Sequence, residues 1–202
     1  MIDFVATFIV FFAVIDPIGT VPVFIAVTQH HDEPTRRRLA LIATSVSAAV
    51  LLFFVVAGEI ILRAMSIPLS AFRIAGGLLL FLFAITMLLG ESKPEKELSL
   101  ADSGNDSAIF PLAVPSIAGP GAILTAVLLT ENARFNLAEQ AQTVLMILAV
   151  LVVAFVLMLL ASRVQRVIGS SGASVISRVM GLILASAATN NVLKGVKEYF
   201  EI

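Results

Sequence analysis

Long runs of apolar residues, separated by short polar segments, set the pattern of this chain. Six runs reach the length of about 20 residues that an α-helix needs to cross the hydrocarbon core of a bilayer. They are apolar on all faces and do not alternate with a period of two, as the strands of a membrane β-barrel do. Because a helix satisfies its own backbone polar groups, the pattern predicts an all-α membrane protein with six transmembrane helices. The predicted spans cover residues 4–27, 39–62, 70–89, 108–129, 143–162 and 174–193.

One connection is longer and more polar than the others. Residues 91–107 read ESKPEKELSLADSGNDS and separate the first three spans from the last three. We therefore expect a first three-helix repeat over residues 1–90, a polar linker loop over 91–107 and a second three-helix repeat over 108–202. Since three is an odd number of crossings, the second repeat would enter the membrane from the opposite face, as in many secondary transporters.

The two halves also share local sequence features. Residues 14–22 read VIDPIGTVP and residues 113–121 read AVPSIAGPG, so each has two prolines five positions apart with glycine beside them. The third and sixth predicted spans open on similar stretches, RIAG from Arg73 and RVMG from Arg178. These matches predict two inverted repeats whose first helices, spans one and four, are both broken.

Composition supports a membrane protein and excludes several other classes. Apolar residues make up 59% of the chain and charged residues 13%, whereas a soluble domain is about a quarter charged. Thirteen Lys and Arg against fourteen Asp and Glu leave no basic surface for a nucleic acid. The absence of cysteine excludes disulfides, thiolate metal sites and thiol redox chemistry. The expected partner is the lipid bilayer, and no metal or cofactor is expected.

Positive charge is unevenly shared between the two membrane faces. Five of the thirteen Lys and Arg residues fall on the side of the N-terminus, and eight, including the run Arg36 to Arg38, fall on the other side. Lys and Arg are in excess in cytoplasmic loops, so both termini are predicted to lie outside. Near the interfaces, Glu59 and Arg63 have the spacing of a helical ion pair. Arg73 and Arg178 are expected to extend to the lipid headgroups.

The prolines in spans one and four predict interrupted helices. Proline lacks a backbone donor and frees the carbonyl four residues before it, and nearby glycine lets the chain leave helical geometry. In a membrane such polar groups must be buried in protein or line a cavity, so the two breaks are expected to face each other. The helix start at a break suits a carboxylate, and freed carbonyls suit an ammonium group or a cation. A zwitterionic amino acid would use both. The alternative is that the prolines only kink the helices for packing.

Asp16 is the most informative polar residue, because it lies about twelve residues, or roughly 18 Å, into the first span. A carboxylate at that depth must be protonated, paired or hydrated. It can serve as a partner for a substrate ammonium or as a proton carrier, and it can equally cap the helix that restarts at Pro17. Ser116 is beside the matching break. Asn190 and Asn191 lie in the sixth span, where they either reach a ligand or bond between helices.

These considerations define the candidate substrate-binding residues. They are Asp16, Pro17, Ile18, Gly19, Thr20, Pro115, Ser116, Ile117, Ala118, Gly119, Gly121, Asn190 and Asn191. No catalytic residue is proposed, because the chain has no zincin motif, no P-loop and no histidine within a span that could activate a serine. We therefore do not expect an enzyme.

The chain resembles the MarC family over essentially its whole length. The resemblance rests on six spans, the stretches DPIGTVP from Asp16 and PSIAGPG from Pro115, and the pair Asn190-Asn191. Members of this family are prokaryotic inner-membrane proteins. Similarity to members that move small neutral amino acids such as glycine and alanine implies a transporter here, with the two Pro/Gly stretches holding the substrate.

The prediction from sequence is thus a multi-pass inner-membrane secondary transporter of small neutral amino acids. Its small-molecule substrate would be held at the breaks in spans one and four, with H⁺ or Na⁺ as the coupling ion if transport is coupled. A homo-oligomer is compatible with the sequence. The alternatives are a non-selective channel, an exporter of other small solutes and a membrane scaffold subunit without transport.

Overall fold

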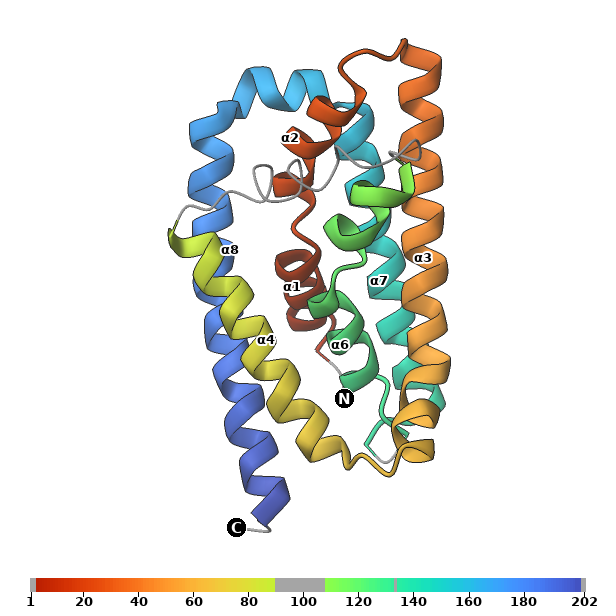
Figure 1. The fold of residues 1–202 in the computed structure, drawn as a ribbon, viewed down its shortest axis with the longest axis vertical. Helices are drawn as coiled ribbons and strands as arrows, with labels where there is room; N and C mark the ends of the chain where they lie inside the picture. Colours follow the sequence, from red (N-terminus) through yellow and green to blue (C-terminus); the bar gives the residue numbers. More distant parts are fainter. Residues whose placement is uncertain (1–2, 90–107, 133, 201–202) are drawn as a thin grey trace.

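The computed structural model describes residues 3–89, 108–132 and 134–200, and the regular elements in these ranges are all helices (Figure 1). The predicted linker, 91–107, lies outside the described residues. The elements are α1 (Phe4–Ile15), α2 (Pro17–Thr28), α3 (Glu33–Ala64), α4 (Leu69–Leu89), η1 (Ala108–Ile117), α6 (Pro120–Leu128), α7 (Leu137–Leu159) and α8 (Ala161–Phe200).

The helices account for the six predicted spans, and the predicted all-α membrane fold is confirmed. Five segments are long and apolar enough to cross a bilayer, among them α1 with α2 counted as one span. The sixth is the pair η1 and α6, which is bent by 47° at its break. Helices α3 and α7 begin about a turn and a half before the predicted spans, because polar first turns extend them. At α7, Asn136 and Glu139 form a capping box.

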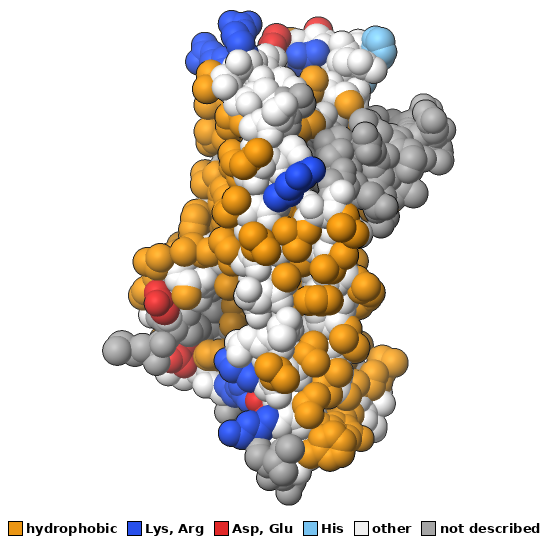
Figure 2. All heavy atoms as spheres, turned by 90° about the vertical axis from the view of Figure 1, so that its left-hand side faces the viewer, with side chains coloured by type: hydrophobic (Ala, Val, Ile, Leu, Met, Phe, Trp, Pro, Cys, Tyr) orange, Lys and Arg blue, Asp and Glu red, His pale blue; other side chains and the backbone are white. Residues whose placement is uncertain are grey.

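The surface has the layout of a membrane protein. In Figure 2, hydrophobic side chains cover the middle of the face shown, while most charged side chains gather at its two ends. The two chain termini lie at the same end of the bundle (Figure 1), as an even number of crossings requires. We call this the terminal end, and the other end the far end.

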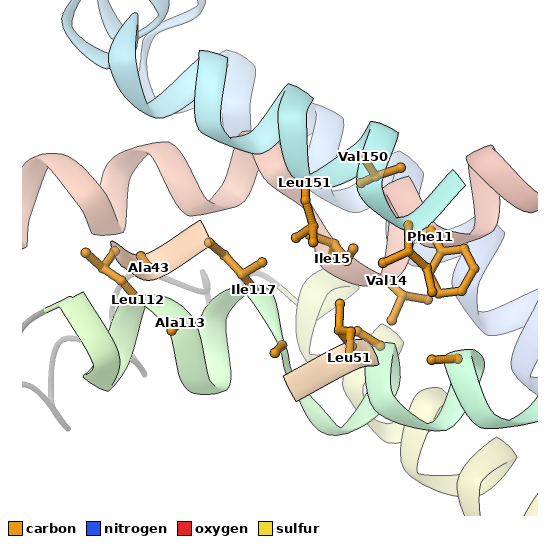
Figure 3. Packing of buried hydrophobic residues seen from close by; sticks show 14 of the residues in the cluster. Phe11, Val14, Ile15, Ala43, Leu51, Leu112, Ala113, Ile117, Val150 and Leu151 are labelled. Carbon is orange, nitrogen blue, oxygen red and sulfur yellow. The ribbon is translucent and has the colours of Figure 1, made fainter. Parts of the chain in front are cut away.

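The interrupted first span lies in the centre of the bundle. Its most apolar window is 61% buried, against 22% for the corresponding window of α3. Figure 3 shows Phe11, Val14 and Ile15 of α1 packed among Leu51 of α3 and Leu151 of α7. Residues of η1, including Leu112 and Ile117, belong to the same core. The first span, and the fourth span beyond its exposed start at Ile109 and Phe110, are therefore shielded from lipid by the helices around them.

Helices α4 and α8 pack against each other through glycines. A Cβ added at Gly77 would lie 3.0 Å from the carbonyl oxygen of Ala188, and one at Gly195 would lie 2.9 Å from that of Ser70. A Cβ at Gly181 would lie 3.2 Å from another α4 carbonyl oxygen. Residue numbers rise along α4 as they fall along α8, so the two helices are antiparallel. Small residues at such contacts let membrane helices approach closely.

This packing predicts a large effect from added volume at Gly77. Gly77→Leu should lower the free energy of unfolding by about 2 kcal/mol, because the side chain would meet the backbone of α8. The measurement is unfolding of the purified protein in detergent. Ser186→Leu, on the exposed side of α8, is the control and should change stability little. Equal stability of the two variants would contradict the close packing.

Candidate functional site

The first span breaks at Asp16. This residue has φ 48° and ψ 67°, a left-handed conformation, between the last residue of α1 and the first of α2. Its N–H donates to the carbonyl oxygen of Phe12 at 2.9 Å and so closes α1. Its Oδ1 accepts from the N–H of Gly19 at 3.0 Å and so caps α2. The capping contact that the sequence allows is therefore present, and it places a carboxylate at the positive end of a half-helix.

The surroundings of Asp16 are closed and polar. The residue is 1% exposed. Its Oδ2 accepts from Oγ of Ser177 in α8 at 3.4 Å, and Oγ1 of Thr20 donates to its carbonyl oxygen at 3.1 Å. A Cβ at position 19 would lie 2.0 Å from Oδ2, so a larger residue there would displace this carboxylate. Ser177 was not identified from the sequence, since nothing in the spacing of residues links it to Asp16.

The fourth span is interrupted more extensively. Within η1, Phe110 and Val114 have extended backbone angles, and the chain bends again before α6 begins at Pro120. Pro17 and Pro120 therefore hold the same position, each at the start of a half-helix. The sequence match instead aligns Pro17 with Pro115 and Pro22 with Pro120. The structure differs because α2 continues through Pro22 without a break. Pro22 is the sixth residue of α2, so it removes the N–H that would otherwise donate to the carbonyl oxygen of Ile18.

The two breaks meet inside the bundle, as predicted. Oγ1 of Thr20 and Oγ of Ser116 lie 3.2 Å apart, and both residues are buried. A Cβ at Gly121 would lie 3.0 Å from the side chain of Val14, which places the start of α6 against the end of α1. The carbonyl oxygen of Ala113 in η1 accepts from the N–H of Ala118 at 2.8 Å, and Oγ of Ser47 in α3 lies 3.2 Å from the same oxygen.

The directions of the half-helices give this region its electrostatics. From the breaks, α2 runs toward the far end and α6 runs toward the terminal end (Figure 1). The N-terminal, partially positive ends of both therefore point toward the middle of the bundle. Asp16 occupies one of these ends, whereas Gly119 precedes α6 without a side chain that could cap it. The arrangement offers one carboxylate and one uncapped helix start at neighbouring breaks.

Most of the candidate residues are brought together, but the asparagine pair is not. Asn190 is exposed on α8, and Asn191 is half-buried. They lie 13 and 14 positions beyond Ser177, or roughly 20 Å along the helix axis from the residue that contacts Asp16. The residues at the two breaks are Asp16, Pro17, Ile18, Gly19, Thr20, Pro115, Ser116, Ile117, Ala118, Gly119 and Gly121.

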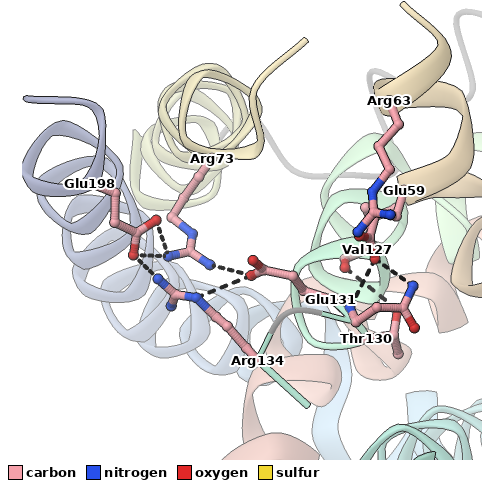
Figure 4. Close-up of polar contacts among 9 residues, drawn as sticks. Glu59, Arg63, Arg73, Val127, Thr130, Glu131, Arg134 and Glu198 are labelled. Carbon is pink, nitrogen blue, oxygen red and sulfur yellow. Dashed lines mark hydrogen bonds and ion pairs between the residues drawn. The ribbon is translucent and has the colours of Figure 1, made fainter. Parts of the chain in front are cut away.

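A charged cluster at the terminal end was missed by sequence reasoning (Figure 4). Arg73 of α4 donates to both carboxylate oxygens of Glu198 in α8, at 2.6 and 2.8 Å, and lies 3.3 Å from Glu131. Arg134 pairs with the same two carboxylates. Arg73 is 4% exposed, so the expectation that it extends to the headgroups is wrong. Its two terminal nitrogens pair with carboxylates inside the bundle, while Nε is buried without a partner among the described residues. Arg178 is exposed.

Glu59 forms a second set of polar contacts at the same end. It pairs with Arg63, as the spacing predicts. It also accepts from the backbone N–H and the Nδ2 of Asn132 at 2.8 and 2.7 Å. The connection between α6 and α7 is thus bound to α3 through Glu59, to α4 through Glu131 and to α8 through Arg134. These contacts close the terminal end beneath the fourth span.

No group of three or more His, Asp or Glu side chains that could hold a metal ion occurs among the described residues. The polar groups at the breaks are instead hydroxyls, one carboxylate and backbone atoms. Such a set is suited to hydrogen bonding of a small polar ligand.

The contact between the breaks predicts energetic coupling of Thr20 and Ser116. Each of Thr20→Val and Ser116→Ala removes one hydroxyl, and the double variant removes both. In a double-mutant cycle of unfolding in detergent we expect a coupling free energy of roughly 0.5–1 kcal/mol. Strictly additive effects of the two substitutions would show that the hydroxyls do not interact.

Removal of Arg73, the central cation of the charged cluster at the terminal end, should cause a larger loss of stability. Arg73→Gln should lower the free energy of unfolding by about 3 kcal/mol, because Glu131 and Glu198 would lose their buried partner. Arg178→Gln is the matched control and should have little effect, since Arg178 is exposed. Comparable unfolding of the two variants would rule out a stabilising role for the cluster.

Comparisons with known proteins agree with this architecture. The family model described as "MarC family integral membrane protein" matches residues 1–200. A UPF0056 membrane protein of Methanocaldococcus jannaschii is 34% identical, and the alignment covers 96% of each chain. The UPF0056 inner membrane protein YhgN of Escherichia coli K12 is 30% identical over 100% of each chain. No solved structure matches the chain. By its full-length match, the chain belongs to the MarC family of integral membrane proteins.

Proposed function

We propose that this protein is a secondary transporter of small neutral amino acids of the glycine and alanine type. The observation that carries the proposal is the meeting of two helix breaks, joined by Thr20 and Ser116, beside the buried carboxylate of Asp16. Broken helices that meet inside a bundle are the usual substrate sites of secondary transporters.

The chemistry of the breaks is suited to a small zwitterion. The uncapped start of α6 can receive a carboxylate, and Asp16 can receive an ammonium group. Gly119 and Gly121 carry no side chains, and a ligand could reach their main-chain atoms once Pro115, Leu80 and Val14, which now fill the adjoining space, move away. In this arrangement Gly19, Thr20, Gly119 and Gly121 supply backbone contacts and Ser116 supplies a hydroxyl. Asp16 would have to exchange some of its present hydrogen bonds for the ligand.

The packing supports an inverted-repeat transporter rather than an open pore. Helix α3 of the first half packs on η1 and α6, and α7 of the second half packs on α1 and α2. This reciprocal arrangement is what an axis in the membrane plane would produce. The charged cluster closes the terminal end, so a substrate would have to leave or enter there by a movement that separates it.

We place the protein in the inner membrane, because a full-length relative is named as an inner membrane protein. The excess of Lys and Arg at the far end supports a cytoplasmic far end and external termini. H⁺ or Na⁺ is the proposed coupling ion, and Asp16 is the group through which a proton would act. The proposal requires no enzyme activity, and it allows a homo-oligomer.

Counterflow in proteoliposomes tests the function. Vesicles loaded with unlabelled glycine, alanine or serine should accumulate the labelled amino acid transiently when they contain the wild-type protein. Asp16→Asn should abolish accumulation or shift its pH dependence, while the amide keeps the capping of α2. Asp3→Asn is the matched control, because Asp3 caps α1 in the same way at the exposed start of the chain.

The outcomes separate the alternatives. Failure of wild type to accumulate any of the three amino acids would remove the proposed substrate class. Flux that does not saturate and shows no counterflow would indicate a channel. Absence of both uptake and substrate-dependent thermal stabilisation would favour a scaffold subunit. Wild-type transport by Asp16→Asn at all pH values would leave Asp16 with a structural role alone.

A further inference from the structure

The far end of the bundle carries a short helical segment that lies across it. Residues 161–168 form the first part of α8 and run between the end of α7 and the turn at Gly169 (Figure 1). Gly169 has φ 66°, which favours glycine. Val167 is 85% exposed, next to the exposed Arg166. Exposed apolar and basic side chains on one helix are typical of a helix that lies in the membrane interface.

A cleft of about 440 Å³ opens between this segment and the start of α3. Its walls combine charged groups from both elements with two exposed leucines at the end of α7. The lining residues are Glu33, Arg37, Leu159, Leu160, Ser162 and Arg163. The cleft thus combines basic with apolar groups, and a free inorganic ion would have no use for the apolar ones.

The arginines of this cleft differ in how they are used. Arg36, which lines a narrower adjoining pocket, donates Nε to the carbonyl oxygen of Thr28 at 3.0 Å and so joins α2 to α3. By contrast, the side chains of Arg37 and Arg163 make no hydrogen bond or ion pair with any residue that the structure describes. With Glu33 as the acidic residue of the lining, the cleft keeps a net charge of about +1. Two unpaired guanidinium groups match the geometry of phosphate oxygens.

We propose that this cleft binds the phosphodiester headgroup of an anionic phospholipid. Arg37 and Arg163 would hold the phosphate, Ser162 would donate its hydroxyl, and the acyl chains would lie along Leu159 and Leu160. The single negative charge of the phosphodiester balances the charge of the cleft. Basic pockets between transmembrane helices are common sites for such headgroups. This inference is independent of the transported substrate, because the cleft lies at the far end and not at the breaks.

Lipid titration of the delipidated, detergent-purified full-length protein tests the proposal. Phosphatidylglycerol should raise the unfolding temperature and remain bound in native mass spectrometry, whereas phosphatidylcholine and inorganic phosphate should not. Removing both arginines, in Arg37→Gln with Arg163→Gln, should weaken the binding of phosphatidylglycerol roughly tenfold or more. The single variant Arg163→Gln, which changes an exposed side chain, should weaken it less and guards against loss of folding.

The matched control is the double variant Arg38→Gln with Arg166→Gln. It removes the same charge from the same two elements, but neither residue lines the cleft, so binding should stay within about twofold of wild type. An equal loss in both double variants would overturn the site in favour of diffuse attraction. Equal stabilisation by phosphatidylcholine would overturn the role of the anionic headgroup. If inorganic phosphate alone raised the unfolding temperature, the assignment of the cleft to a lipid would be overturned.

Discussion

The constraint on which this structure depends is that backbone polar groups cannot be left unpaired in hydrocarbon. Each unpaired group costs several kcal/mol there, so a helix can be interrupted only where other parts of the chain replace the lost bonds. At the first break, the carboxylate of Asp16 receives the N–H of Gly19. At the second, the carbonyl oxygen of Ala113 accepts from the N–H of Ala118 and lies within reach of the hydroxyl of Ser47 in another helix. The two interrupted spans are consequently central, and the continuous helices surround them.

The spans and the approximate places of the breaks could be predicted because both are local properties of sequence. An apolar run of 20 residues shows itself without knowledge of its neighbours, and so does a proline beside a glycine. The effect of each proline was less predictable. Pro17 and Pro120 begin half-helices, whereas Pro22 lies within α2 without breaking it. The difference is one of position within a helix, which depends on where the helix starts.

The contacts between distant residues could not be predicted in the same way. Ser177 is 161 positions from Asp16, and Glu198 is 125 positions from Arg73. A serine in an apolar helix and a glutamate near its end are ordinary in isolation. Only the packing of α8 against the first half makes them partners of buried charges. The same packing carries Asn190 away from the breaks, although its polarity within a span suggested a place there.

The glycine contacts between α4 and α8 have a mechanical consequence. Three glycines lie against the backbone of the partner helix. They are Gly77 of α4 and Gly181 and Gly195 of α8. A small axial slide would bring a bulky side chain against main-chain atoms at each of these points. Interlocked in this manner, the two helices resist shear, and their pairing is reinforced at one end by Arg73 and Glu198. In a large rearrangement of the bundle, α4 and α8 would therefore move together as one rigid unit relative to the interrupted spans.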